Sequence, residues 1–216
     1  MTGWAQAALV GVLLLDLQLA ATSRLDALIR AFAIQSFLVA LLALLLDGLG
    51  NPHAWAVAAG SFLLKAVVIP HFLRRAAVRT GSRRELEPSV SYGVSILLVA
   101  LAMGLSFGLA AKLPMEARRA GLLLAAAAFS TILTGLFLLV SRSKALTEVV
   151  GYLVMENGIF LFGLTLLRRM PVLVEIGILL DVFVGASVMG IVVYNIHRTF
   201  DHIDVSALTA LKEEDS

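Results

Sequence analysis

Cysteine is missing from the sequence, although the chain has 216 residues. Its absence excludes disulfide bonds, thiolate metal ligands, iron–sulfur ligation and a cysteine nucleophile within this chain. Any redox chemistry that involves the protein would therefore take place on partner subunits.

The motifs of nucleotide-dependent and metal-dependent enzymes are also missing. The sequence has no P-loop and no HExxH pair. Its four histidines lie near the ends of apolar runs without metal-ligand spacing, and they are His53, His71, His197 and His202. We therefore expect no catalytic residue, no cofactor site and no metal site in this chain, which would not be catalytic on its own.

Charge is sparse and nearly balanced. Charged residues make up 15% of the chain, and the formal net charge is +2. The basic residues occur in short clusters between apolar runs rather than along one face. This pattern excludes a nucleic-acid partner and is typical of the topology signals of a membrane protein.

Apolar residues dominate the sequence instead. They make up 60% of the chain, whereas an ordinary soluble domain has roughly 45–50%. A membrane-spanning helix needs about 20 mostly apolar residues. Seven segments of that kind occur, at residues 4–22, 28–47, 54–73, 90–111, 119–140, 146–166 and 172–196. The sequence thus predicts an all-α integral membrane bundle of about seven transmembrane helices, with the lipid bilayer around it.

Lysine and arginine residues predict the orientation of this bundle. With seven spans, the first, third and fifth connections and the C-terminus share one side and hold eleven basic residues, against five on the opposite side. Because basic residues concentrate on the cytoplasmic side, we expect the N-terminus outside and the C-terminus in the cytoplasm. The remaining basic residue, Lys65, lies inside the third span. The tail, residues 199–216, is too polar to span and is expected to lie along the cytoplasmic surface.

Ionisable residues lie near the middle of four predicted spans, and they are Asp16, Lys65, Glu156 and Asp181. An uncompensated charge at that depth costs at least about 2.5–3.5 kcal/mol, so such groups face the bundle interior, form pairs or become neutral. Burial generally raises the pKa of a carboxyl toward neutrality, which is what a proton relay requires. We expect Glu156 and Asp181 to be relay carboxyls and Lys65 to tune them. The alternative is that one carboxyl pairs permanently with Lys65 and only fixes the helix register.

Further polar residues are secondary candidates for the same relay. Asp16 is expected to form a polar seam with Gln18 and Gln35 between the first two spans. Glu148 and Glu175 lie close to predicted span ends, where a solvated position is expected. His71 is near the cytoplasmic edge and could supply protons to an internal path.

Two backbone features are expected to shape the helices. Pro70 has no backbone N–H, so the carbonyl of Ala66 loses its normal helical partner close to Lys65, and the helix should bend there. Small residues recur four positions apart at Ala100, Gly104 and Gly108. This spacing predicts a close approach of another helix to the fourth span.

Four separated segments resemble one protein family. They read KAVVIP at 65–70, YLVMENG at 152–158, PVLVEIGILLD at 171–181 and DVSALTALK at 204–212. In this order they resemble the hydrogenase-4 component E (HyfE) family. The resemblance extends over most of the chain and is strongest from residue 142 onward.

The resemblance implies a membrane subunit of a group 4 NiFe-hydrogenase complex, of the formate hydrogenlyase type and related to complex I. Its partners would be antiporter-like and quinone-site-like membrane subunits in a bacterial or archaeal cytoplasmic (inner) membrane. The NiFe centre and the iron–sulfur clusters would belong to other subunits. The implied division is an N-terminal four-helix region at 1–112, a three-helix region at 113–198 that is similar to NuoK and MrpC, and the cytoplasmic tail at 199–216.

One departure from this family pattern concerns the carboxyls. NuoK-type subunits carry two intramembrane glutamates, and the flanking residues place them opposite Leu153 and Gly185, neither of which is acidic. Glu156 lies three residues after the first position and Asp181 four residues before the second. Each carboxyl is therefore displaced by about one helical turn on a similar face. The resemblance does not imply an identical proton path.

Sequence and resemblance together predict a non-catalytic subunit that contributes to proton translocation driven by redox chemistry in partner subunits. Two alternatives remain open at this point. In the first, the chain is an autonomous small transporter of ions or solutes. In the second, it is a purely structural linker between larger pump subunits. The sequence leaves the transported ion, H⁺ or Na⁺, undecided as well.

Overall fold

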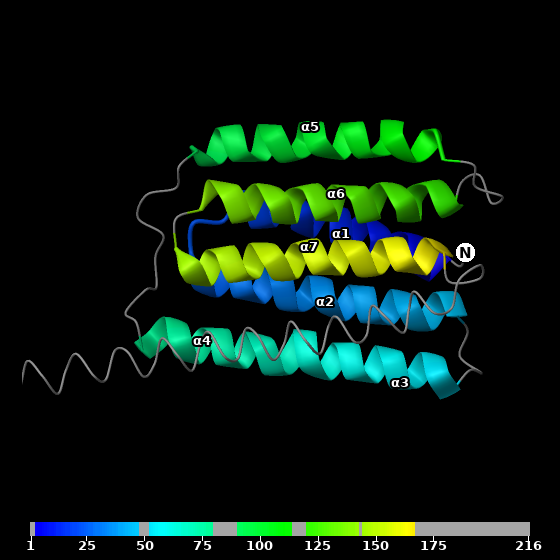
Figure 1. Cartoon of the computed structure of the whole chain (residues 1–216), viewed down its shortest axis with the longest axis horizontal. Helices are drawn as coiled ribbons and strands as arrows, with labels where there is room; N and C mark the ends of the chain where they lie inside the picture. The colour runs from blue at the N-terminus through cyan, green and yellow to red at the C-terminus, as the bar shows by residue number, and fades with distance from the viewer. Residues whose placement is uncertain (1–2, 48–51, 80–89, 114–119, 143, 167–216) are drawn as a thin grey trace, which may run out of the picture.

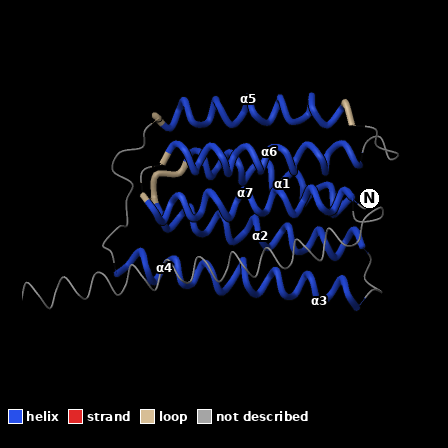
Figure 2. The backbone as a smooth tube through the Cα atoms, in the orientation of Figure 1, coloured by secondary structure: helices blue, strands red, loops and turns tan. Residues whose placement is uncertain are grey.

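The computed structural model describes residues 3–47, 52–79, 90–113, 120–142 and 144–166. All elements in these ranges are helices (Figures 1 and 2), so the predicted all-α fold is confirmed. The elements are α1 (Gly3–Ala21), α2 (Leu25–Asp47), α3 (Pro52–Ser61), the π-helix η1 (Phe62–Val68), α4 (Ile69–Arg79), α5 (Tyr92–Ala111), α6 (Ala120–Ser141) and α7 (Ala145–Leu166).

The helices form an up-and-down bundle. Elements α3, η1 and α4 continue one another as one rod, and successive rods run in opposite directions (Figure 1). Five helices are individually long and apolar enough to cross a membrane, namely α1, α2, α5, α6 and α7. The α3–η1–α4 rod corresponds to the remaining predicted span within the described residues. The protein is therefore a multi-pass membrane protein, and the predicted span at 172–196 lies outside the described residues.

Basic residues gather at one end of the bundle, which we call the basic end. Helices α1, α4 and α6 finish there, and α2, α5 and α7 begin there (Figure 1). The basic residues that the described ranges place near this end are Arg24, Arg30, Arg74, Arg75, Arg79, Arg142 and Lys144. Lys112 lies at the opposite end. This arrangement brings together the connections that the sequence analysis assigned to one side.

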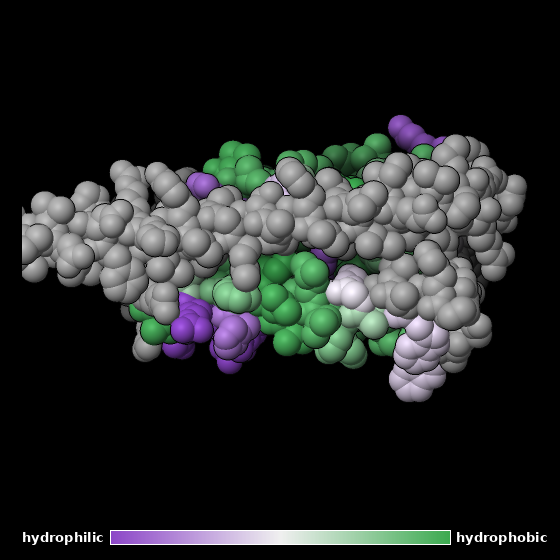
Figure 3. All heavy atoms as spheres, turned by 60° about the horizontal axis from the view of Figure 1, so that its bottom comes forward, coloured by the Kyte–Doolittle hydropathy of each residue, from purple (hydrophilic) through white to green (hydrophobic). Residues whose placement is uncertain are grey.

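The outer surface between the two ends is apolar. Figure 3 shows hydrophobic residues along the middle of the described surface and hydrophilic residues nearer its ends. Helix α5 is the clearest case, because Leu97, Leu101 and Leu105 are 58%, 61% and 58% exposed. Side chains of this kind on the outside of a helix are expected where the solvent is lipid.

The small-residue stripe of α5 is not a helix contact within the described bundle. Ala100, Gly104 and Gly108 are all exposed. A Cβ added to Gly104 or Gly108 would meet no described atom within 4 Å. The predicted close approach at this stripe is therefore wrong for the described helices, because the stripe faces outward from the bundle.

The close approach occurs instead between α6 and α7. A Cβ added to Gly158 would lie 2.5 Å from the backbone nitrogen of Ile132, and one added to Gly151 would lie 2.8 Å from that of Leu139. Gly135 of α6 lies equally tightly against the backbone of Met155. Contacts this close to backbone atoms require glycine. They fix α7 against α6 on both sides of Glu156 and Asn157.

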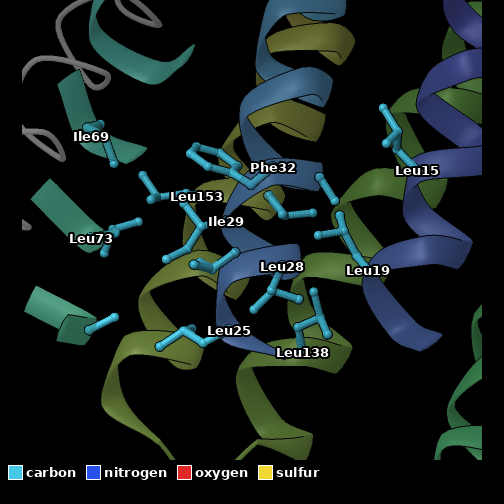
Figure 4. Packing of buried hydrophobic residues seen from close by; sticks show 14 of the residues in the cluster. Leu15, Leu19, Leu25, Leu28, Ile29, Phe32, Ile69, Leu73, Leu138 and Leu153 are labelled. Carbon is cyan, nitrogen blue, oxygen red and sulfur yellow. The ribbon is translucent and has the colours of Figure 1, made fainter. Parts of the chain in front are cut away.

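Two apolar clusters fill the bundle interior, one toward each end. The cluster near the basic end includes Leu19, Phe32, Leu73, Leu138 and Leu153, which come from five helices. Figure 4 shows these side chains pointing toward one another. The cluster toward the opposite end joins α1, α2, α6 and α7, and it includes Leu9, Val12, Leu42, Ala128 and Leu161. In α2, α6 and α7, buried polar residues lie between the two clusters.

Candidate functional site

A layer of buried polar side chains crosses the bundle between the two apolar clusters. Its members come from α1, α2, η1, α6 and α7, and each is at most 2% exposed. We call it the polar layer, and it consists of Asp16, Gln35, Ser36, Lys65, Ser130, Thr131, Glu156 and Asn157. Most of these residues lie far from the helix ends, and Asp16 is nearer the basic end. The layer therefore lies near the middle of the predicted membrane-spanning helices.

Lys65 and Glu156 form the charged end of this layer. The Lys65 Nζ lies 3.6 Å from the Glu156 Oε1, and the two side chains are 1% and 3% exposed. The ammonium also lies 5.8 Å from the centre of the Phe160 ring, within the range of a cation–π contact. Two opposite charges are thus buried together, which lowers the cost of holding either in a non-aqueous interior.

A π-helical segment presents Lys65 to this site. Element η1 has seven residues with Lys65 at its centre, and the Ile69 N–H after it donates to the Leu64 carbonyl five residues back. Pro70 follows and supplies no N–H, so the α-helical hydrogen-bond pattern cannot continue backward from it. The sequence analysis predicted a bend at Pro70, and the structure shows a wider, π-helical turn directly before it. Such π segments rotate the side chains within them relative to an α-helix and are frequent at functional sites.

Asn157 joins the charged pair to α2. Its Oδ1 accepts a hydrogen bond of 3.5 Å from the Lys65 Nζ. Its Nδ2 donates to the Ser36 Oγ at 2.9 Å and to the Gln35 Oε1 at 3.4 Å. One amide therefore contacts η1 through its oxygen and α2 through its nitrogen.

Asp16 terminates the layer on the side of α1 and α6. Its Oδ1 accepts a hydrogen bond of 2.8 Å from the Gln35 Nε2. Its Oδ2 accepts hydrogen bonds from the Ser130 Oγ and the Thr131 Oγ1, both at 3.1 Å. All three donors are neutral groups. The contacts from Glu156 through Lys65, Asn157 and Gln35 to Asp16 are continuous, and they run across the helix axes rather than along them.

The other predicted site residues differ in where the structure places them. Asp16 and Gln35 form the expected seam, but Gln18 is exposed and its inclusion was wrong, because it faces away from α2. Glu148 is exposed near the start of α7, and His71 is exposed in α4. Asp181 and Glu175 lie outside the described residues. The described residues contain no group of three or more His, Cys, Asp or Glu side chains that could hold a metal ion.

Sequence reasoning missed the hydroxyl members of the layer. Ser36, Ser130 and Thr131 were not singled out, because serine and threonine in apolar helices often bond only to their own backbone. Here each bonds to a side chain of another helix. The available signal was their position near the middle of the predicted spans at 28–47 and 119–140, as Glu156 is in its own span.

Arg142 is another residue whose position differs from the expectation. The sequence analysis counted it with the basic residues of the connections, but it is 2% exposed. Its Nη2 donates to the Ala20 carbonyl at 3.0 Å, and its guanidinium lies 5.0 Å from the centre of the Tyr92 ring. It therefore links the C-terminal end of α1 to the start of α5 and the end of α6.

Comparison with known proteins identifies the family. The chain is 31% identical over 194 residues to a Mycobacterium tuberculosis protein described as uncharacterized, covering 88% of this chain and 87% of that protein. It is 34% identical over 156 residues to hydrogenase-4 component E of Escherichia coli, covering 71% of each chain, and Shigella flexneri hydrogenase-4 component E matches equally. Neither a family model nor a solved structure matches the chain. The identity and coverage show that the chain belongs to the hydrogenase-4 component E family.

Proposed function

We propose that this chain is a non-catalytic membrane subunit of a complex I-related NiFe-hydrogenase complex, and that it contributes to proton translocation driven by redox chemistry in partner subunits. Family membership supports the hydrogenase assembly, since the Escherichia coli and Shigella flexneri relatives are named as components of hydrogenase-4. The observation that carries the proton-translocation role is the polar layer. A bundle that only needed to span lipid would not require a lysine and two carboxyls in its interior.

The polar layer has the chemistry that a proton relay requires. Both Asp16 and Glu156 can exchange a proton between a neutral and a charged form, and Lys65 can offset the charge of the nearby Glu156. Charges at this depth cost at least about 2.5–3.5 kcal/mol each when uncompensated. Redox work in partner subunits would change which of these groups is protonated. Glu156 and Asp181 are the relay carboxyls in this proposal, and Lys65 is the charge that tunes them.

The remaining parts of the assembly follow from the same proposal. The partners are antiporter-like and quinone-site-like membrane subunits, and the NiFe centre and iron–sulfur clusters belong to other subunits. The N-terminus lies outside and the C-terminus in the cytoplasm of a bacterial or archaeal inner membrane. Residues 1–112, the NuoK-like region 113–198 and the tail 199–216 are its three parts.

The test is Glu156→Gln in the intact complex, with Asp26→Asn as the matched control. Both changes replace a carboxyl by an amide, but Asp26 lies in the first turn of α2 and away from the polar layer. We expect Glu156→Gln to leave hydrogen production unchanged and to lower proton uptake into inverted membrane vesicles. Asp26→Asn should leave both unchanged. Full proton uptake with Glu156→Gln would remove Glu156 from the relay.

A structural linker is the second candidate, and the buried ion pair between Lys65 and Glu156 favours it. Such a pair fixes helix register and can often be replaced by apolar residues of similar volume. The double variant Lys65→Met with Glu156→Met separates the two functions. A linker would retain both assembly and coupling in this variant, whereas the proposed relay would retain assembly and lose proton uptake.

A further inference from the structure

The hydrogen bonds between Lys65 and Asp16 all point in one direction. Lys65 Nζ donates to Asn157 Oδ1, Asn157 Nδ2 donates to Gln35 Oε1, and Gln35 Nε2 donates to Asp16 Oδ1. The chain therefore begins at a cation, passes through two amides aligned head to tail and ends at a carboxylate. Its three links are 3.5, 3.4 and 2.8 Å long.

The charges at the two ends determine this direction. An amide has an acceptor oxygen and a donor NH₂ group. Reversing Asn157 would place its NH₂ group against the Lys65 ammonium, and reversing Gln35 would place its oxygen against the Asp16 carboxylate. Both reversed contacts are repulsive, so a charged Lys65 and a charged Asp16 favour the same orientation of both amides.

The same two amides block the passage of a proton. A group that passes a proton along a chain must accept one on the side where it arrives and release another on the far side. In each amide, the oxygen that faces the arriving proton is too weak a base to take it up, and release of a proton from the NH₂ group on the far side would leave the unstable imidic-acid form of the amide. A proton at Lys65 or Glu156 therefore does not reach Asp16 by this route, although hydrogen-bonded chains do polarise one another.

We infer that Asn157 and Gln35 are positioning residues that transmit the charge of the Lys65 ammonium to the Asp16 carboxyl through aligned amide dipoles, without passing a proton. This inference rests on the proposed relay for its role in energy coupling, and it divides that relay into two proton-bearing groups. One group is Lys65 with Glu156, and the other is Asp16 with its hydroxyl donors Ser130 and Thr131. Each group exchanges protons by its own route, and the amide pair makes the charge of one depend on the other.

The experiment follows the Gln35 side-chain amide by NMR in the full chain, labelled with ¹⁵N at glutamine. The chain has three glutamines, Gln6, Gln18 and Gln35. Gln6 and Gln18 are exposed, so their signals are internal references. Spectra are recorded at one pH without redox turnover, so the result does not depend on whether the complex translocates protons.

We expect Lys65→Met to shift the Gln35 Nε2 proton signal upfield, because the loss of the cation weakens the polarisation of the whole chain. The Gln6 and Gln18 signals should not move. In an Asn157→Leu background, or in Asn157→Ser if the leucine variant does not fold, Lys65→Met should cause no further shift of Gln35. Ser36→Ala removes an acceptor of Asn157 that is not in the chain, and in that background the Lys65→Met shift should persist.

Two results would overturn the inference. The first is a Gln35 signal that does not respond to Lys65→Met in the parent chain. The second is a response of equal size after Asn157 has been replaced, since the coupling would then bypass the amide. Neither result bears on the Glu156→Gln transport test, so failure of the inference and failure of the proposed function can be distinguished.

Discussion

Gly158 is the position where the packing of the polar layer can be tested most directly. A Cβ at this residue would lie 2.5 Å from the backbone nitrogen of Ile132 and 2.9 Å from the carbonyl oxygen of Ala128. Both atoms belong to the α6 backbone, which cannot move aside as a side chain can. Gly104 of α5 is the matched control, because a Cβ there would meet no described atom within 4 Å.

The expected magnitude comes from comparing Gly158→Ala with Gly104→Ala. Alanine is favoured over glycine in a helix interior by about 0.8–1.0 kcal/mol, and this gain is common to both variants. Overpacking costs about 1–3 kcal/mol, and only Gly158→Ala incurs it. The difference between the two free energies of unfolding should therefore be about 1–3 kcal/mol. At about 2–4 °C per kcal/mol for a chain of this size, this lowers the unfolding midpoint of Gly158→Ala by roughly 2–12 °C relative to the control.

The assay is thermal unfolding in one detergent, followed by circular dichroism at 222 nm for the parent and both variants. We expect Gly104→Ala to unfold at or slightly above the parent temperature and Gly158→Ala to unfold below it. Equal midpoints for the two alanine variants would refute the close α6–α7 contact. The same result would refute the argument that this contact holds Glu156 and Asn157 in place.

Three further predictions concern charged groups inside the bundle. Lys65→Met alone should lower the free energy of unfolding by about 3–5 kcal/mol, because it leaves Glu156 buried without the lysine; adding Glu156→Met should recover much of this loss in the same melt. Asp16→Leu should lower the free energy of unfolding by about 1–3 kcal/mol for each buried donor that it leaves without an acceptor. Asp16→Asn keeps an acceptor oxygen and should lower it less, as measured by chemical denaturation. Arg142→Gln should cost about 1.5–3 kcal/mol through the lost charged hydrogen bond, whereas Lys112→Gln at the exposed opposite end should stay within about 0.5 kcal/mol of the parent.

The helices could be predicted from the sequence because hydropathy and span length are properties of consecutive residues. The predicted spans at 4–22 and 146–166 correspond to Gly3–Ala21 and Ala145–Leu166. The position of Lys65 and Glu156 near the middle of their helices was predicted from the same span boundaries. Family resemblance added the hydrogenase-4 component E assignment, which the comparisons confirm.

The contacts around the site could not be predicted, because they depend on which way each helix faces. Lys65 is followed 92 residues later by Asn157, and nothing in the local pattern joins them. The stripe at Gly104 and the glycine at 158 look alike in sequence, yet among the described helices only Gly158 has a close neighbour. A bundle with apolar residues on both its inner and outer surfaces gives little periodic signal for that choice.

The polar layer also has an electrical consequence, which follows from its direction. Moving one charge fully across a membrane involves about 2.3 kcal/mol for each 100 mV of potential. Charge that is redistributed along a chain that runs mainly across the helix axes changes its depth little and therefore meets only a small part of this potential. On the inference above, coupling between Lys65 and Asp16 is only weakly sensitive to membrane voltage, and the voltage acts mainly where a proton enters or leaves the layer.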